Sequence, residues 1–367
     1  MRDLFIGLMS GTSLDGVDGV LVDFAGGRMQ VRQYATLPFA PALRTELLAL
    51  NTPGGDELHR AALAANELVG VYADVVQQLL ERSGTRSDQV QAIGAHGQTV
   101  RHRPQEFGGT GYTLQLNNPA LLAELTGVNV VADFRSRDVA AGGQGAPLVP
   151  AFHQQVFGRA GEAVAVLNIG GISNLSLLDG QILGFDCGPG NALMDHWCQL
   201  HTGQPYDADG AWAASGTVHP TLLATLLGEP YLAKAPPKST GRDLFNPPWL
   251  ANKLQGFAGL ASVDVQATLT ELTARAVSTC MSSYGKSSKL LIVCGGGALN
   301  GRLMQRLQAL LPGVQVQSST AHGLPPLQVE AAAFAWLARQ TVLGLPGNLA
   351  SVTGARGERV LGAIYPA

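Results

Sequence analysis

The segment from Gly11 to Asp18 combines small, hydroxylic and acidic residues that suit an anionic ligand and a metal ion. Backbone amides and hydroxyls of such a turn can point at an anion, and its carboxylates can hold a hydrated Mg²⁺. No GxxxxGK[ST] pattern occurs in the chain, so a phosphate would meet a hairpin turn instead of a loop that opens a helix. An ordinary Gly-Asp β-turn is the alternative interpretation. The residues are Gly11, Thr12, Ser13, Leu14, Asp15, Gly16, Val17 and Asp18.

Two further glycine-rich segments follow predicted strands. The first, at 168–174, occupies the equivalent place in the second half of the chain, and two such hairpins can clamp one phosphate chain. The second, at 295–300, follows a strand and opens a helix, where bare backbone would let a planar ring or a phosphate approach closely. A tight strand-to-helix turn is the alternative there. The candidate residues are Gly170, Gly171, Asn174, Gly295, Gly296, Gly297 and Asn300.

Two acidic residues are candidates for acid–base chemistry. Asp186 ends a predicted strand over 182–186 and precedes a Gly-Pro-Gly run, so it would project from a rigid edge. The alternative is an N-cap for a helix that begins near residue 190. Glu330 lies in the first turn of an apolar helix, where an acid needs a partner. Its alternative role is a favourable interaction with the helix dipole.

The elements that must position these residues follow one pattern twice. In the first half, three strand-like runs are followed by helical periodicity over 42–50 and 57–83, a strand over 90–95, a helix over 119–125 and a strand over 128–132. In the second half, strands over 163–169, 174–178 and 182–186 precede helices, a strand over 290–294 and helices over 300–311 and 327–342. Both halves begin with a meander whose first turn is glycine-rich. This predicts a duplicated α/β fold with a cleft between two domains.

The domain boundaries follow from this pattern. The first domain is predicted to comprise residues 1–131 together with 326–367, and the second domain residues 132–325. A chain of 367 residues is long enough for two ordinary cores.

Charge and composition exclude several classes of partner. The chain has 24 Lys+Arg against 27 Asp+Glu, a net charge of −3, and no long basic run, which argues against a nucleic-acid groove or an anionic membrane surface. The apolar stretch at 4–9 is too short for a signal sequence or a membrane span. The four cysteines form no CxxC pair, as expected of reduced thiols in a cytoplasmic protein.

Eight sequence blocks in order give the chain a specific resemblance. The two hairpins and the glycine turn resemble the nucleotide core of the actin, hexokinase and heat-shock-70 superfamily, which has an actin-like, ribonuclease H-like duplicated fold. The blocks GTSLDGVD, HGQTVRHRP, ADFRSRDVAAGGQGAP, NIGGISNLS, FDCGPGNALMD, KSTGRDLFN, TLTELTA and PPLQVEAAAFAWLA then resemble the anhydro-N-acetylmuramic acid kinase family. The resemblance implies a homodimeric, Mg·ATP-dependent kinase of peptidoglycan recycling. Its product would be N-acetylmuramic acid 6-phosphate, made from the 1,6-anhydro sugar.

The resemblance also implies roles for individual residues. O6 of the anhydro sugar is tied to C1, so a water must attack C1 while O6 leaves toward the γ-phosphorus. Asp186 is then the catalytic base for that water and Glu330 assists it, while Asp15 and Asp18 lie near Mg²⁺. A cation should meet the lactyl carboxylate of the sugar. Gln98 and Thr99 would bind its hydroxyls, and a turn that ends the strand over 90–95 is the alternative for these two residues. Arg135 is favoured for the carboxylate among the cations in matching positions, which also include Arg137, Lys238 and Arg242.

Three alternatives remain open at this stage. A conventional amino-sugar kinase would use Asp186 to deprotonate a free hydroxyl on the same fold. A non-catalytic, ATP-driven clamp would use the same nucleotide core, but little of the chain is left for a peptide-binding domain. The segment 142–145 would either close over a ligand or serve as a plain glycine-rich connection.

Overall fold

The computed structural model describes residues 3–11, 13–241 and 244–367, which form two compact units. The first unit comprises Met1–Val156 together with Leu327–Ala367, and the second unit comprises Phe157–Pro326. The second boundary falls within one residue of the predicted one. The first falls 25 residues later, so the assignment of residues 132–156 to the second domain was wrong.

The physical reason is that residues 132–156 find their partners in the first unit. Ala132 is the last residue of a strand in the first sheet. The buried carboxylate of Asp138 accepts hydrogen bonds from Asn348 (2.6 Å) and Thr353 (2.7 Å). Gln155 accepts a hydrogen bond from the Trp336 indole at 2.6 Å. The polar residues that follow Ala132 mark the end of a strand, but they do not mark the end of the domain.

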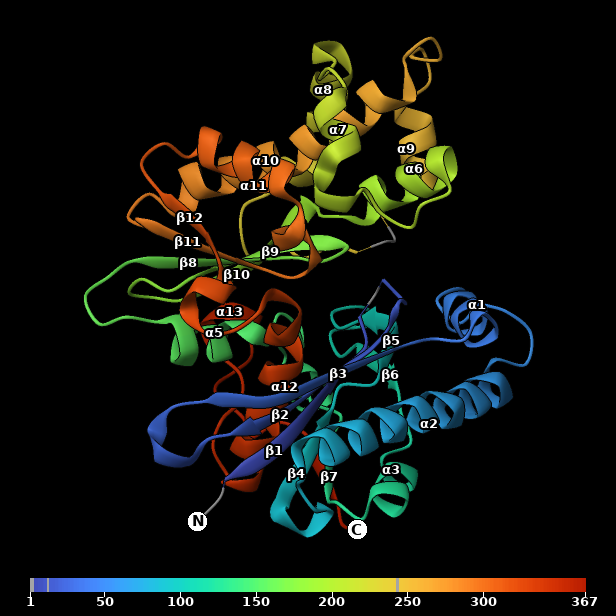
Figure 1. The fold of residues 1–367 in the computed structure, drawn as a ribbon, viewed down its shortest axis with the longest axis vertical. Helices are drawn as coiled ribbons and strands as arrows, with labels where there is room; N and C mark the ends of the chain where they lie inside the picture. Colours follow the sequence, from blue (N-terminus) through green and yellow to red (C-terminus); the bar gives the residue numbers. More distant parts are fainter. Residues whose placement is uncertain (1–2, 12, 242–243) are drawn as a thin grey trace. The chain divides into compact units, whose positions relative to one another are not determined.

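The first unit is built on a six-stranded sheet (Figure 1). Its strand order is β13-β7-β4-β1-β2-β3. The strands β1 to β3 form an antiparallel meander, β4 and β7 continue parallel to β1, and β13 closes the edge antiparallel to β7. Their bounds are β1 Leu4–Met9, β2 Gly16–Asp23, β3 Gln30–Pro38, β4 Val90–Ala95, β7 Val130–Ala132 and β13 Ala363–Tyr365.

Helices cover both faces of this sheet. The long helix α2 contacts β2 and β3 on one face, and α12 contacts β1, β2 and β4 on the other. The helix α12 approaches closely because Gly7 and Gly94, paired on β1 and β4, carry no side chain: a Cβ there would lie 1.8 Å from the Ala331 carbonyl oxygen and 2.0 Å from that of Phe334. The helices are α1 Pro41–Ala49, α2 Glu57–Ser83, α3 Pro119–Thr126, α4 Ser136–Ala140, α5 Val149–Phe157, α12 Val329–Val342 and α13 Ala350–Thr353, with short 3₁₀ turns at Ala25–Gly27 and Ser87–Gln89.

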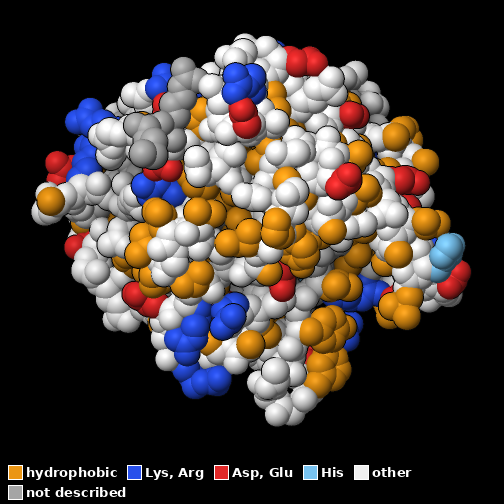
Figure 2. Space-filling view, turned by 90° about the horizontal axis from the view of Figure 1, so that it is seen from below, with side chains coloured by type: hydrophobic (Ala, Val, Ile, Leu, Met, Phe, Trp, Pro, Cys, Tyr) orange, Lys and Arg blue, Asp and Glu red, His pale blue; other side chains and the backbone are white. Residues whose placement is uncertain are grey.

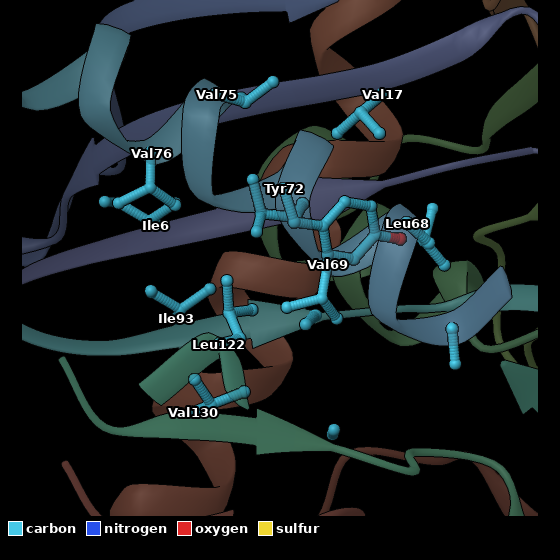
Figure 3. Close-up of a cluster of buried hydrophobic side chains, with 14 of the residues drawn as sticks. Ile6, Val17, Leu68, Val69, Tyr72, Val75, Val76, Ile93, Leu122 and Val130 are labelled. Atoms are coloured by element: carbon cyan, nitrogen blue, oxygen red, sulfur yellow. The ribbon is translucent and has the colours of Figure 1, made fainter. Parts of the chain in front are cut away.

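The core of the first unit lies between α2 and the sheet (Figure 3). Buried residues recur along α2 at spacings of three and four, which gives the helix one apolar face. Tyr72 is fully buried among them, and its hydroxyl forms a 2.9 Å hydrogen bond with Ser10. The side chains labelled in Figure 3 are Ile6, Val17, Leu68, Val69, Tyr72, Val75, Val76, Ile93, Leu122 and Val130.

The second unit repeats the strand order of the first. Its sheet runs β10-β9-β8-β11-β12, with an antiparallel meander from β8 to β10 and with β11 and β12 parallel to β8. In both units the first strand is central, with its own hairpin on one side and later parallel strands on the other. This confirms the predicted duplicated α/β fold. The bounds are β8 Val164–Ile169, β9 Ile172–Leu177, β10 Leu183–Pro189, β11 Leu290–Cys294 and β12 Gln315–Ser318.

The helices of the second unit gather around the buried helix α10. Odd-numbered apolar residues of β8 and β9, such as Leu167 and Leu175, belong to the hydrophobic core of the second unit. Side-chain caps of Asn246 and Asn300 begin α9 and α11. The helices are α6 Ala192–Thr202, α7 Ala211–Ser215, α8 Pro220–Leu227, α9 Pro247–Lys253, α10 Ser262–Tyr284 and α11 Gly301–Leu310; 3₁₀ turns occupy Ala208–Gly210, Pro230–Ala233, Gly296–Leu299 and Ser319–His322. A further 3₁₀ turn, Pro326–Gln328, contains the point where the chain passes from the second unit to the first.

A two-stranded sheet in the first unit was not predicted. It consists of β5 Gln98–Arg103 and β6 Tyr112–Leu116, which pair antiparallel. Gln98 and Thr99 lie at the start of β5 and not in a turn that ends the strand over 90–95, because the backbone reverses earlier, at Gly97, whose φ is +78°.

On the face shown in Figure 2, basic and acidic side chains are mixed with hydrophobic ones, and neither sign of charge dominates. This agrees with the net charge of −3. In the part of the chain that the structure describes, none of the helices combines the length and apolar character needed to span a membrane.

Candidate active site

The first hairpin joins β1 to β2 in the first unit. The Leu14 amide donates to the Gly11 carbonyl oxygen at 3.2 Å, and Leu14 has a positive φ of +58°. Thr12 lies outside the described residues. The hairpin is therefore a tight turn with Gly11 and Ser13 at its tip, as the sequence predicts.

The two carboxylates of this hairpin differ in environment. Asp15 is exposed and lies 3.9 Å from the Arg44 guanidinium. Asp18 is partly buried and accepts a 2.5 Å hydrogen bond from the Tyr34 hydroxyl. Burial raises the pKa of Asp18, hydrogen bonds from Tyr34 and Thr36 oppose this rise, and the charge of Asp15 adds to it. The two carboxylates thus repel each other, a pair that a divalent cation would stabilise.

The second unit brings its two glycine-rich turns together. The turn at Gly170–Gly171 joins β8 to β9, and its carbonyl oxygens accept backbone hydrogen bonds from residues 190–192 at the start of α6. Gly295 follows β11 with a φ of +75°, and a Cβ on Gly297 would lie 2.3 Å from Ile169, the residue before the first turn. Asn191 donates to the Ile169 carbonyl oxygen at 3.2 Å and also borders Gly296. Backbone of both turns therefore lies at one end of this sheet.

The two asparagines predicted to bind the cofactor lie in different places. Asn300 caps α11, with its side-chain oxygen accepting from the Leu303 amide at 2.9 Å, so part of its hydrogen-bonding capacity serves the helix. Asn174 lies opposite Asn168 on β8 and opposite Asp186 on β10. Directly paired residues share a face of a sheet, so these three polar side chains form a row on the face opposite the core.

Asp186 projects from within β10. The strand continues to Pro189 past a bulge at Cys187, so the prediction that Asp186 ends the strand was wrong. Asn191, and not Asp186, precedes the first turn of α6, which excludes the N-cap alternative. One Asp186 carboxylate oxygen accepts from the Thr240 amide at 2.9 Å. Burial raises the pKa of Asp186 to about 7, while the Thr240 hydrogen bond and the Lys238 charge oppose this.

A second polar cluster in the first unit surrounds Arg135. Its guanidinium lies 2.9 Å from His96 Nε2 and donates to the Gly145 carbonyl oxygen at 2.8 Å. Burial, together with the smaller effect of the Arg135 charge, lowers the pKa of His96 to about 3. The histidine is therefore neutral, with Nε2 as an acceptor for Arg135 and Nδ1 facing the Ser10 carbonyl oxygen. This arrangement fixes the direction of the Arg135 side chain.

The predicted sugar-binding residues Gln98 and Thr99 lie near the first hairpin. Gln98 donates to the Gly11 carbonyl oxygen at 3.1 Å, and its buried Oε1 has no hydrogen-bond partner among the described protein groups. Thr99 accepts from Gln115 at 3.2 Å. A buried acceptor without a partner is unusual, and a ligand hydroxyl would satisfy it.

Glu330 is partly buried in the first turn of α12, as predicted. Burial lowers the pKa of Arg135 to about 10. The negative charges of Glu330 and, to a smaller extent, Asp138 oppose this fall. Glu330 and Arg135 therefore lie within electrostatic reach of each other in the first unit.

Of the remaining predicted cations, the structure describes two. Arg137 is exposed on α4. Lys238 is buried, and Arg242 lies outside the described residues. His96 and His102 belong to no cluster of three or more His, Cys, Asp or Glu side chains within the described ranges.

The segment 142–145 is fixed by hydrogen bonds. The Gly145 amide donates to the Asp138 carboxylate at 2.7 Å, and the Gln144 amide donates to the Thr353 carbonyl oxygen at 2.8 Å. These contacts favour the connecting role over that of a closing loop.

The groups that hold the side chains of Asp186 and Arg135 were not predicted from the sequence. No supporting role was predicted for His96, for Thr240 or for Tyr231, whose hydroxyl donates to the Asp186 carbonyl oxygen at 3.0 Å. Tyr231 precedes the KSTG block by seven residues and lies 45 residues from Asp186, so no local pattern joins them. The KSTG block itself was the available signal, since its Thr240 holds the Asp186 carboxylate.

Comparison with known proteins identifies the family. The family model described as anhydro-N-acetylmuramic acid kinase matches residues 3–367. A protein named anhydro-N-acetylmuramic acid kinase from Variovorax paradoxus is 72% identical over 372 residues, covering 100% of this chain and 99% of its own. Proteins of the same name from Albidiferax ferrireducens and Cupriavidus pinatubonensis are 65% and 59% identical, covering 100% and 99% of this chain and 100% and 98% of their own lengths. The chain belongs to the anhydro-N-acetylmuramic acid kinase family.

Proposed function

We propose that this protein is an ATP-dependent kinase that opens the ring of 1,6-anhydro-N-acetylmuramic acid with water and phosphorylates O6. The product is N-acetylmuramic acid 6-phosphate, an intermediate of peptidoglycan recycling. Family membership over the whole chain supports the substrate. The proposed mechanism rests on the environment of Asp186, whose carboxyl is partly buried and has a pKa of about 7.

The reaction needs a base because the water that replaces O6 at C1 must lose a proton, while the C6–O6 bond stays intact. Water oxygen bonds to C1 and loses a proton to the base. The electron pair of the C1–O6 bond stays on O6 and forms the new bond to the γ-phosphorus. The bond from that phosphorus to ADP breaks, so the products are ADP, one proton and the sugar phosphate. Phosphoryl transfer itself depends mainly on positioning and electrostatics.

Asp186 is suited to take the proton. A general base works best when its pKa lies near the pH at which it operates, because it is then both ionised and basic enough. The Thr240 amide holds one carboxylate oxygen of Asp186 at 2.9 Å, which fixes the side chain. Activity should accordingly rise with pH through about 7, where the pKa of Asp186 lies and the carboxyl loses its proton.

ATP is assigned to the glycine-rich turns and Mg²⁺ to the acidic hairpin. In the second unit, the Gly170–Gly171 and Gly295–Gly297 turns offer backbone for phosphate and adenosine. In the first unit, Asp15 and Asp18 would hold a hydrated Mg²⁺, and the rise in the pKa of Asp18 caused by burial and Asp15 fits such a pair. When bound, Mg²⁺ supplies positive charge for the phosphoryl oxygens.

The sugar is assigned to residues of the first unit. Arg135, held by His96 and the Gly145 carbonyl oxygen, would bind the lactyl carboxylate. Gln98, with its unpaired buried Oε1, and Thr99 would bind sugar hydroxyls. Glu330 is proposed to assist Asp186 in holding the water, as the family resemblance implies.

We also propose that the protein works as a homodimer in the cytoplasm. The homodimer is implied by the family resemblance. All four cysteines are buried and free, which supports a reducing compartment. Sedimentation equilibrium of the purified protein tests the dimer, and a single species of 38.2 kDa would contradict it.

Product mass spectrometry in heavy-oxygen water tests the substrate and mechanism together. The protein is incubated with Mg·ATP and 1,6-anhydro-N-acetylmuramic acid in H₂¹⁸O. The expected product carries one phosphate at O6 and one solvent oxygen at C1. A parallel reaction in ordinary water, quenched and then transferred to H₂¹⁸O, controls for later exchange at the anomeric carbon.

Failure to convert the anhydro sugar would point to a different function. If the anhydro sugar yields no product but an open amino sugar gains phosphate without solvent oxygen, the enzyme is a conventional kinase. Asp186 would then serve as the base for a sugar hydroxyl. Binding of ATP with no phosphorylated sugar of either kind would favour the non-catalytic clamp.

A further inference from the structure

The segment 231–240 surrounds Asp186 in the second unit. The Asp186 amide donates to the Lys238 carbonyl oxygen at 3.1 Å, and the Tyr231 hydroxyl donates to the Asp186 carbonyl oxygen at 3.0 Å. With the Thr240 amide on the carboxylate, the backbone and the side chain of Asp186 are both held by this segment. A Cβ on Gly188 would lie 2.7 Å from Leu232, so the strand and the segment are in close contact.

Lys238 is the charged residue at the centre of this segment. Only 6% of it is exposed, which is unusual for a lysine. Its ammonium donates to the Leu232 carbonyl oxygen at 3.2 Å and lies 5.0 Å from the centre of the Tyr231 ring. These two contacts carry no full negative charge, whereas a buried ammonium needs one nearby. Its charge acts on the Asp186 carboxylate.

We propose that Lys238 is a positioning residue for Asp186: its ammonium supplies the countercharge that keeps the carboxylate ionised, and its backbone fixes the strand that carries it. This inference rests on the proposed role of Asp186 as the base. It gives Lys238 a function other than binding the lactyl carboxylate of the sugar, because the ammonium is directed to Leu232 and Tyr231.

The other polar and titratable groups around Asp186 in the described part of its unit do not replace this charge. Cys187 follows it on β10, and Cys280 on α10 contacts Cys187. Tyr231 belongs to the same segment as Lys238, and Asn174 lies opposite on β9. None of these four groups is a cation. Removing the ammonium should therefore leave the effect of burial on the Asp186 carboxyl unopposed by any charge among them.

The test uses charge-removing and charge-keeping variants of the full-length protein. Lys238→Gln keeps a donor for the Leu232 carbonyl oxygen, Lys238→Met keeps the apolar stem, and Lys238→Arg keeps the charge. The matched control is Lys234→Gln, because Lys234 is exposed and lies over the same Tyr231 ring, 5.8 Å from its centre. Melting temperatures show which variants fold, and Lys238→Gln carries the test if Lys238→Met does not.

The expected result is a shift of the acid limb of kcat/KM to higher pH. Loss of a neighbouring opposite charge raises the pKa of a carboxyl by about 1 or more, which lowers kcat/KM at pH 7 about five-fold. Activity should return toward the wild-type value near pH 9, while the KM for ATP stays unchanged. Lys238→Arg should restore the wild-type profile, and Lys234→Gln should not alter it.

Carbon-13 NMR of labelled aspartate separates this proposal from the proposed function. The signal of Asp186 is identified by its loss in Asp186→Asn and is titrated in wild type and in Lys238→Gln. A titration midpoint at the same pH in both proteins would overturn the role of Lys238, as would an equal shift in Lys234→Gln. If Asp186→Asn keeps full turnover, the base assignment fails, while the NMR shift still decides whether Lys238 acts on Asp186.

Discussion

At the scale of single residues, the structure distinguishes two kinds of ionisable group. Burial raises the pKa of Asp186 to about 7, so this carboxyl gains and loses a proton near neutral pH. His96 is kept neutral at physiological pH because burial and Arg135 lower its pKa to about 3. The first group can exchange a proton during turnover, whereas the second serves as a fixed acceptor. This difference supports the proposed role of Asp186 in proton transfer and of His96 in orienting Arg135.

Replacement of Asp186 by asparagine tests the base directly. Asp186→Asn keeps the size of the side chain but cannot accept a proton, so kcat should fall by roughly 10² to 10⁴. ATP affinity, measured by calorimetry, should be unchanged, because the glycine turns remain intact. Asp179→Asn, at an exposed turn of the same unit, is the control. Turnover at the wild-type rate in Asp186→Asn would remove this residue from the mechanism.

The candidate site residues could be proposed from the sequence, whereas the groups that hold their side chains could not. Asp186, Glu330 and Arg135 could be named because each lies in a distinctive local block. The neutral His96 beside Arg135, and the buried ammonium of Lys238, depend on contacts between segments 39 and 52 residues apart. Burial and a distant partner determine the charge state of such groups, and neither is visible in a local pattern.

At the scale of elements, two glycines set the position of α12. Gly7 and Gly94 are paired across β1 and β4, and each faces backbone of α12, the helix that carries Glu330. A side chain at either site would meet backbone atoms, which cannot rotate away as a flexible side chain can. The position of Glu330 therefore depends on the lack of a Cβ atom at both Gly7 and Gly94.

Substitution of Gly94 by alanine should displace this helix. Its Cβ would lie 2.0 Å from the Phe334 carbonyl oxygen, so Gly94→Ala should lower the free energy of unfolding by about 2 kcal/mol or more. Turnover should fall as well if Glu330 assists the base. Gly70→Ala, within α2 where a Cβ meets nothing within 4 Å, should raise stability by up to about 1 kcal/mol. Urea unfolding measures both, and equal stability of the two variants would contradict this account of α12.

Elements with strong periodicity were predicted well. The helix over 57–83 matches α2, and the strand over 290–294 matches β11, because one has a clear apolar face and the other is wholly apolar. The β5–β6 hairpin was missed because QTVRHR lacks regular alternation. The strand β13 was missed because its three residues are mostly exposed and it exists only through pairing with β7.

At the scale of the whole molecule, the second unit is one continuous stretch of chain, whereas the first is assembled from two stretches. Residues 157–326 contain a complete sheet and their own core. The first unit needs Leu327–Ala367 for α12, which covers one face of its sheet. The two units should therefore differ in how they respond to truncation.

Expression of fragments tests this difference. A fragment of residues 157–326 should fold alone and melt cooperatively when followed by circular dichroism. A chain that ends at residue 326 should retain that transition and lose the one that belongs to the first unit. A non-cooperative melt of the 157–326 fragment would show that its core depends on the rest of the chain.

The three-residue strand β13 has a consequence for solubility. It occupies the outer edge of β7, whose residues Val130, Val131 and Ala132 are all buried. An uncovered strand of this kind offers unpaired amides and carbonyls to strands of other molecules. Residues 363–365 thus cover this edge of the sheet, and we predict that their removal promotes self-association of the protein.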